Sequence, residues 1–159
     1  MTQKYQCGGL MERGDLCLVE VLGFDWQPGQ ACGILTKFGA AGISLSYLTV
    51  GNGANEEKNM SFCVKTEEMA VHRGIIEEIK EEFTPDKVCV NAPVVILTLY
   101  GPHFLERHNL ASEVISALCV AGIKNHTVCS SINSISVVID VPDRDRTVVC
   151  LQEKFEWPQ

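Results

Sequence analysis

The chain has 159 residues, of which 46% are hydrophobic and 21% are charged, and its formal net charge at pH 7 is −7. This composition fits a globular protein of one or two small domains, and the negative charge argues against a nucleic-acid or anionic-membrane surface. No apolar run approaches the ~20 residues that span a bilayer, and the first residues lack the apolar core of a signal peptide, so we expect a cytoplasmic protein.

The first strong pattern is a strand, a tight loop and a helix. Apolar residues predict a strand over 16–23, Pro28 and Gly29 interrupt the chain, and helical spacing predicts a helix over 29–41. Gly42 ends this helix, because glycine tolerates positive φ. Earlier in the chain, we expect a short strand within residues 5–10 and a turn at 12–15.

The rest of the first half supplies two more strands and a second helix. Alternating residues predict a strand over 43–50, and a glycine- and asparagine-rich loop leads to a strand over 60–64. Thr66 suits the N-cap of a helix that runs to about Phe83. After a break at Pro85, a strand is predicted over 87–90. This half therefore has the order βαββαβ.

The strand, loop and helix return in the second half. Residues 31, 34, 35, 38, 41, 42 and 43 align without gaps to similar residues at a constant offset of 80 (111 − 31). We therefore infer a tandem repeat of a βα unit. After a linker at 91–93, the expected elements are a strand over 94–101, a helix over 109–121, a hairpin of strands over 123–130 and 134–141, and a last helix that begins near Pro142.

The second unit has one strand too few, while the segment 5–10 belongs to no unit. We predict that this N-terminal strand completes the second sheet, which would otherwise keep an open edge. The expected fold class is α+β, with two ferredoxin-like βαββαβ units that have antiparallel sheets and helices on one face. The first unit, 13–92, is then inserted into the second, which consists of 1–12 and 93–159.

The side chains give little sign of catalysis or metal binding. None of the eight cysteines forms a C-x-x-C pair, and most occupy apolar positions, which indicates buried thiols in a reducing compartment. His103, His108 and His126 have no carboxylate or cysteine at a matching short spacing. We therefore expect no catalytic residue, metal or cofactor. An enzyme with a His/Cys site remains a minor alternative.

A βαββαβ unit with Pro28-Gly29 in its first loop and 41–43 (Ala-Gly-Ile) after its first helix resembles the ACT domain. The whole chain resembles the tandem ACT regulatory region of aspartate kinases, in which an N-terminal strand completes the second unit. The matching stretches are 23–29, 42–64 and 130–140. The kinase catalytic domain is missing from this match, so the chain looks like a regulatory tail or a short regulatory subunit.

The resemblance implies a non-catalytic sensor that binds an amino acid between paired ACT units, and it implies a homodimer. Helix amides after Pro28-Gly29 can hold a carboxylate, and a side chain of the loop or the next strand can pair with the ammonium group. The ligand-binding residues implied lie in the two loops, the first helix start and the strands that follow: Asp25, Trp26, Gln27, Pro28, Gly29, Gln30, Ala31, Ser44, Ser46, His126, Ser130 and Ser131.

Several of these positions differ from the pattern of the aspartate kinases. Trp26 stands where the family often has Asp, Ser46 stands where an acid is common, and the second loop has His108-Asn109 in place of Pro-Gly. The differences leave the ligand open: a more apolar amino acid than lysine or threonine, or none. The alternative function is an assembly subunit that acts by contact with a catalytic kinase chain.

Overall fold

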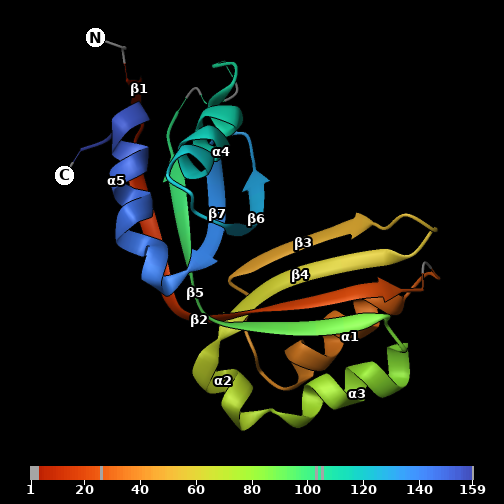
Figure 1. Ribbon diagram of the computed structural model, residues 1–159. Helices are drawn as coiled ribbons and strands as arrows, with labels where there is room; N and C mark the ends of the chain where they lie inside the picture. Colours follow the sequence, from red (N-terminus) through yellow and green to blue (C-terminus); the bar gives the residue numbers. More distant parts are fainter. Residues whose placement is uncertain (1–3, 26, 103, 105, 159) are drawn as a thin grey trace. The chain divides into compact units, whose positions relative to one another are not determined.

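The computed structural model describes residues 4–25, 27–102, 104 and 106–158. Within these ranges the chain is α+β, and the strand pairs with a described register are antiparallel except the short β1–β8 pair (Figure 1). The strands are β1 (Tyr5–Gln6), β2 (Gly9–Phe24), β3 (Tyr47–Asn52), β4 (Lys58–Lys65), β5 (Lys87–Tyr100), β6 (Asn125–Ser130), β7 (Ser134–Asp140) and β8 (Phe155–Glu156). The helices are α1 (Gln30–Ala40), α2 (Thr66–Val71), α3 (Gly74–Phe83), α4 (Leu110–Val120), the 3-10 helix η1 (Val141–Asp143) and α5 (Arg144–Lys154).

The chain divides into two compact units. We call residues 15–93 the continuous unit, and we call residues up to 14 together with those from 94 onward the composite unit. Strands β2 and β5 are long and contribute to both. The strand order is β3-β4-β2-β5 in the continuous unit and β2-β5-β7-β6 in the composite unit.

The predicted turn at 12–15 and the predicted linker at 91–93 are wrong. Each of these segments lies inside one uninterrupted strand, β2 or β5. Polar and proline residues suggested breaks, but β2 and β5 are hydrogen-bonded neighbours in the sheet, and this backbone pairing does not require apolar side chains. Asp15 takes a positive φ of 57° and is exposed without ending the strand.

The predicted single helix over residues 66–83 is also wrong, because the structure divides it into α2 and α3. His72 leaves the helical region at φ −107° and ψ 42°, and Gly74, a weak helix former, follows shortly. Helix α2 buries no residue, whereas α3 buries Ile75, Ile79 and Phe83. The break lets α3 direct its apolar face into the core. Thr66 is the first residue of α2 rather than its N-cap, which is Lys65.

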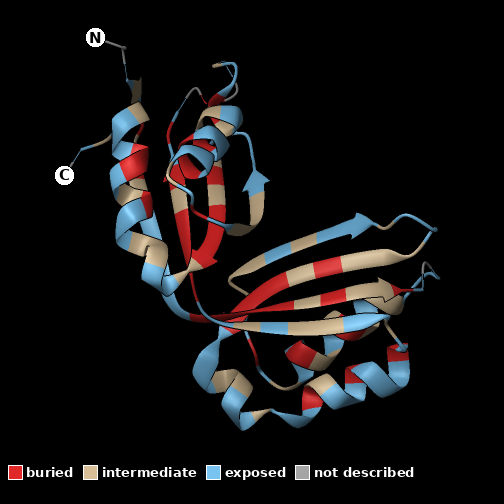
Figure 2. Cartoon of the chain, viewed as in Figure 1, coloured by how far each residue is buried: buried red, intermediate tan, exposed pale blue. Residues whose placement is uncertain are grey.

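In the continuous unit, α1 and α3 cover one face of the sheet (Figures 1 and 2). Alternate residues of β2 point into this core because side chains along a strand alternate between the two faces. Phe38 of α1 meets Phe62 of β4 edge to face, with ring centroids 4.7 Å apart and an interplanar angle of 73°. Both side chains are fully buried. This pair therefore fixes α1 against the sheet.

In the composite unit, α4 and α5 cover the sheet in the same manner (Figure 2). Val95, Leu97 and Leu99 alternate along β5 and pack with residues of β7 and with Leu118 of α4. Leu118 is fully buried and lies at the repeat position of Phe38. The repeat found in the sequence therefore places equivalent residues in the two cores.

The N-terminal segment belongs to the composite unit. Strand β1 pairs in parallel with β8, the amide of Cys7 donates to the carbonyl of Glu156 at 2.8 Å, and that of Gly8 donates to the carbonyl of Tyr100 at 2.7 Å. The packing is close: a Cβ on Gly101 would lie 2.9 Å from the backbone nitrogen of Gly8. The two ends of the described chain thus lie in one unit.

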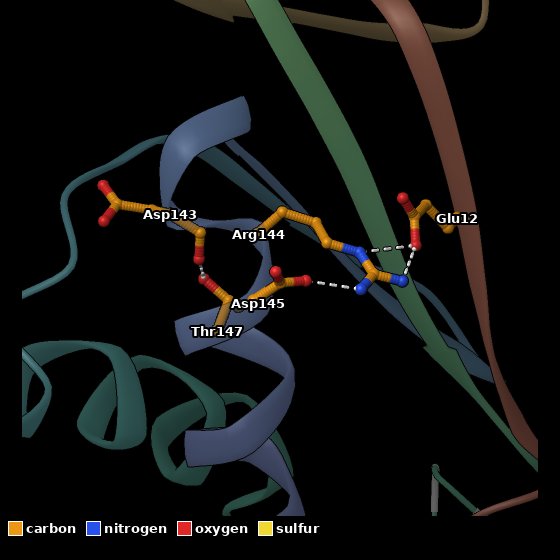
Figure 3. A network of polar contacts seen from close by, with 5 residues as sticks. All are labelled: Glu12, Asp143, Arg144, Asp145 and Thr147. Carbon is orange, nitrogen blue, oxygen red and sulfur yellow. Dashed lines mark hydrogen bonds and ion pairs between the residues drawn. The ribbon is translucent and has the colours of Figure 1, made fainter.

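A polar network joins the first half of β2 to the start of α5 (Figure 3). Arg144 donates to one carboxylate oxygen of Glu12 through Nε at 2.9 Å and Nη2 at 2.6 Å, and through Nη1 to Asp145 at 2.6 Å. These two acids raise the pKa of the Arg144 guanidinium, Glu12 foremost. In the same turn of the chain, the hydroxyl of the buried Thr147 donates to the backbone carbonyl of Asp143 at 2.8 Å. The network holds the N-terminal part of β2 against this unit.

Candidate functional site

The loops before α1 and α4 end in the same backbone conformation. The N-cap residues are Gly29, at φ 96°, and Asn109, at φ 69°. Glycine and asparagine are the residues that adopt this left-handed conformation most readily. Asn109 therefore takes the left-handed conformation before α4 that Gly29 takes before α1. Among the residues that the structure describes, no side chain caps the first-turn amides of α1 or α4 by a hydrogen bond.

The opposite ends of α1 and α4 also match. Gly42 and Gly122 both take a positive φ, of 73° and 64°. The amide of Ile43 donates to the carbonyl of Phe38 at 3.0 Å, and the amide of Ile123 donates to that of Leu118 at 2.9 Å. This is the Schellman arrangement that closes a helix. Both helices therefore start and stop at equivalent positions.

The first loop is exposed around the start of α1. Asp25, Gln27, Pro28 and Gly29 are exposed, and the amide of Gln27 donates to Asp25 Oδ1 at 3.3 Å. Gln30 buries its Oε1 with no hydrogen-bond partner in the described part of the chain. This loop thus presents a carboxylate and an unpaired acceptor next to helix amides.

The other residues of the continuous unit that we expected to bind the ligand lie in different environments. Trp26 lies outside the residues that the structure describes. Ala31 is half-buried against the core of the unit. Ser44 is exposed ahead of β3, and the amide of Ser46 donates to the carbonyl of Cys63 at 2.8 Å. This backbone bond gives Ser46 a part in aligning β3 with β4.

The second loop borders an open cavity of about 260 Å³. Its walls come from the segment before α4, the first turn of α4 and the β6–β7 hairpin, and they include Phe104, Arg107, Asn109, Ser130, Ser131 and Ile135. The hydroxyl groups of Ser131 and Ser134 lie 2.8 Å apart. The structure therefore brings the two expected serines, 130 and 131, to the second loop.

Arg107 is a wall residue that the sequence analysis missed. Its Nη1 donates to the backbone carbonyl of Gln6 at 2.8 Å, which ties the loop to β1. The available signal was a cation two residues before the N-cap of a helix. That signal is weak without the contact to a residue a hundred positions away.

His126 lies elsewhere in the composite unit and does not line this cavity. Its Nε2 is 2.8 Å from Asp140 Oδ1, its side chain is 14% exposed, and the β6–β7 register shifts at this residue. His103 lies outside the described residues. Within those residues no cluster of three or more His, Cys, Asp or Glu side chains is arranged to hold a metal ion.

The cysteines differ partly from the prediction. Cys7, Cys17, Cys63 and Cys150 are buried, but three others are exposed: Cys32, Cys119 and Cys129. Burial raises the pKa of Cys63 to about 12, and desolvation also raises the pKa of the other three buried thiols. Because the thiolate is the nucleophile, the four buried thiols are poor nucleophiles at neutral pH. Among the described helices, none is long and apolar enough to cross a membrane.

No protein-family model matches the chain, and none of the curated proteins is similar to it in sequence. Solved structures are similar in fold. The regulatory subunit of aspartate kinase from Thermus flavus superposes with a TM-score of 0.83 at 17% identity, over 93% of this chain and 97% of that chain. A structure of aspartokinase alpha and beta subunits gives 0.82 at 19% identity, over 93% and 97%.

A larger enzyme also contains this fold. E. coli aspartokinase III in complex with lysine and aspartate gives a TM-score of 0.73 at 15% identity, and the match covers 98% of this chain and 35% of that chain. Together these similarities confirm the resemblance that the ordered motifs predicted. The chain has the fold of the regulatory subunits and regulatory regions of aspartate kinases.

Proposed function

We propose that this protein is a non-catalytic regulator of amino-acid metabolism that binds an amino acid as its effector. In this proposal residues 13–92 and residues 1–12 with 93–159 are the two ACT units, and the protein is a cytoplasmic homodimer with the effector between paired units. The fold shared with regulatory subunits of aspartate kinase supports the regulatory role.

The observation that carries the proposal is the exposed start of α1, where no side chain caps the helix. The amide of Gln30 donates to the carbonyl of Gln27 at 3.3 Å, and the next amides of the first turn together with the helix dipole favour a carboxylate at this point. Asp25 and the buried, unpaired Oε1 of Gln30 are acceptors of the kind that an ammonium group needs. An α-amino acid carries both a carboxylate and an ammonium group.

The mechanism follows from linkage. An effector changes the protein's behaviour only by the difference between its affinities for two states. An amino acid held by the loop of one ACT unit and the sheet of its neighbour would favour the packing in which both contacts are made. A partner protein then reads that packing.

A thermal-shift screen of the full chain against the common amino acids tests the proposal. A ligand at ~100 times its dissociation constant adds about 2.7 kcal/mol of stability, which is a measurable shift. We expect one selective amino acid, with a weaker shift in Asp25→Ala and an unchanged shift in Glu81→Ala, an exposed acid of the same unit. No shift with any amino acid at millimolar concentration would reject the sensor role.

The second candidate function is an assembly subunit of an aspartate kinase. The similar structure with alpha and beta subunits favours it, because this chain matches 97% of a chain in that structure. Affinity purification of the tagged chain from its source cells would then recover a kinase catalytic chain at a fixed stoichiometry, with or without added amino acid. Recovery of the chain alone would count against this function.

A further inference from the structure

The cavity beside the second loop differs in charge from the rest of the protein. The chain as a whole has a formal net charge of −7. Among the described residues that line this cavity, the charged side chain is Arg107, and none is Asp or Glu. The walls also include Ser112, Ser130 and Ser131. The hydroxyl of Ser112 donates to the carbonyl of Asn109 at 2.8 Å, and that of Ser131 lies 2.8 Å from that of Ser134. The cavity is thus a local cationic and hydroxyl-lined space in an acidic protein.

Arg107 is fixed in place and retains hydrogen-bonding capacity. Its Nη1 donates to the backbone carbonyl of Gln6 at 2.8 Å, and no carboxylate in the described ranges forms an ion pair with it. A guanidinium has five N–H donors in a planar fork. The donors not used on Gln6 can therefore bind two oxygens of one anion, the geometry that gives the strongest charge-assisted hydrogen bonds.

The two loops therefore offer different chemistry. The first loop has Asp25, an acid that can pair with an ammonium group. The described lining of the second cavity has no acid, so an ammonium group bound there would lose water without gaining a partner. This difference selects against zwitterions and in favour of ligands that carry only negative charge.

Size limits the ligand further. Pockets for drug-sized molecules have volumes of about 300–1,000 Å³, and this cavity has about 260 Å³. We propose that the cavity walled by Arg107, Ser130 and Ser131 is a second binding site, specific for a small dianion that lacks an ammonium group, such as a short dicarboxylate or a phosphate. Arg107 is its specificity-determining residue. This site is separate from the first loop around Asp25; Ser130 and Ser131, which the resemblance places at an amino-acid site, are assigned here to the dianion.

Isothermal titration of the full chain with succinate and with aspartate tests the specificity, because the two molecules differ by one ammonium group. We expect succinate to bind at least about tenfold more tightly than aspartate, and Arg107→Gln to weaken succinate binding by about tenfold or more, the usual scale for a charged hydrogen bond. Inorganic phosphate in a parallel titration distinguishes the two sources of a dianion: tighter binding of succinate or of phosphate identifies which class fits.

Arg146→Gln is the matched control. Arg146 lies in the same unit and also donates to a backbone carbonyl, that of Ala121 at 2.6 Å, but it does not line this cavity. It should leave succinate binding unchanged. Arg107→Lys keeps the charge without the planar fork, and it provides the measurement if Arg107→Gln does not fold; we expect intermediate affinity.

Three results would overturn the proposal: neither succinate nor phosphate binds at millimolar concentration, aspartate binds as tightly as succinate to Asp25→Ala, in which the first site is disabled, or the Arg107 variants bind like the wild type. Asp25→Ala should not change succinate binding. Loss of amino-acid binding in that variant with succinate binding intact would show that the two sites are independent. Failure of one site therefore leaves the other testable.

Discussion

The continuous and composite units repeat one backbone plan with different surfaces. Helices α1 and α4 begin after left-handed caps and end in the same Schellman arrangement. Between α1 and α3, however, Lys37 binds Glu82 at 2.6 Å and Glu78 at 3.4 Å. At the repeat position of Lys37 the composite unit has Ala117, and the groove between α4 and α5 is lined partly by Val120, which is 85% exposed.

The difference teaches which features of a repeat are constrained. A left-handed residue at a helix end favours glycine or asparagine, and α1 and α4 follow this preference at both ends, whereas Thr84 takes this conformation at the end of α3. The helix surface carries no such restriction: Lys37 joins α1 to α3 by two ion pairs, whereas α4 and α5 are joined by a different pair, Glu113 with Lys154 at 3.4 Å. The same division separates the loops: both end in a left-handed residue, but the first carries Asp25 and the second carries Glu106 and Arg107.

The largest expected effect comes from removing residues 1–12, because only the composite unit depends on a distant segment. The deletion removes the β1–β8 pair, the Gly8–Tyr100 bond and Glu12, the partner of Arg144. We expect aggregation or loss of this unit's unfolding transition in urea, with the continuous unit retained. A soluble truncation of unchanged stability would contradict the insertion topology.

Single substitutions test the contact between the N-terminal segment and Gly101, with a smaller expected loss of stability than the deletion. Gly101→Ala places a Cβ 2.9 Å from the nitrogen of Gly8, whereas the equivalent atom on Gly14 meets nothing within 4 Å. We expect Gly101→Ala to lower the urea concentration at the midpoint of unfolding because of this clash. Gly14→Ala should not have this effect.

The two cores should respond in parallel to truncation at equivalent positions. Phe38→Ala and Leu118→Ala each remove a fully buried side chain. Substitutions of this kind cost about 3–5 kcal/mol for Phe and about 2–5 kcal/mol for Leu, and we expect Phe38 to cost more because it also loses the ring of Phe62. Urea unfolding followed by circular dichroism measures both. A cost below about 1 kcal/mol at either site would mean that the core is not packed as described.

The shared helix ends predict equal effects. Gly42→Ala and Gly122→Ala each force a side chain into the left-handed region, at a cost of about 1–2 kcal/mol. Gly39→Ala is the control, since it lies inside α1 with open space around it and should stabilise the protein by about 0.5–1 kcal/mol. If one of the two end positions tolerates alanine, the helices do not end alike.

The smallest effect should come from Lys37→Met, which removes the two ion pairs that join α1 to α3 in the continuous unit. The hydrogen bond to Glu82 is the first cause that raises the pKa of Lys37 above 10.5. A raised pKa stabilises the fold below the unfolded value and ceases to do so as the pH rises through the folded value, so the wild type should lose this contribution only in strong alkali. Thermal unfolding at low and high salt measures it, because salt screens exposed pairs.

A stability loss in Lys37→Met that is independent of salt would point to lost packing of the lysine stem instead. Lys87→Met, at an exposed lysine of the same unit, controls for the change of net charge.

The places of some candidate site residues depended on contacts between residues that are far apart in sequence. The place of Arg107 depends on Gln6, and the place of His126 on Asp140. Asp25 and Gly29, in contrast, were found because a Pro-Gly loop before a helical pattern is a local signal. The second cavity was therefore only half predicted: its serines followed from the resemblance to aspartate kinase regulatory regions, but the cation that sets its charge did not.

The sequence by itself determined the repeat, the α+β class and the ends of α1 and α4, because periodicity and positive-φ residues act over a few positions. It also predicted the resemblance to aspartate kinase regulatory regions that the fold comparison confirmed at 14–19% identity. Only the tertiary structure decided that β2 and β5 run without a break, that the helix predicted over 66–83 divides, and that Arg107 lines a cavity. Each of these depends on pairing or packing with a partner that the local sequence does not contain.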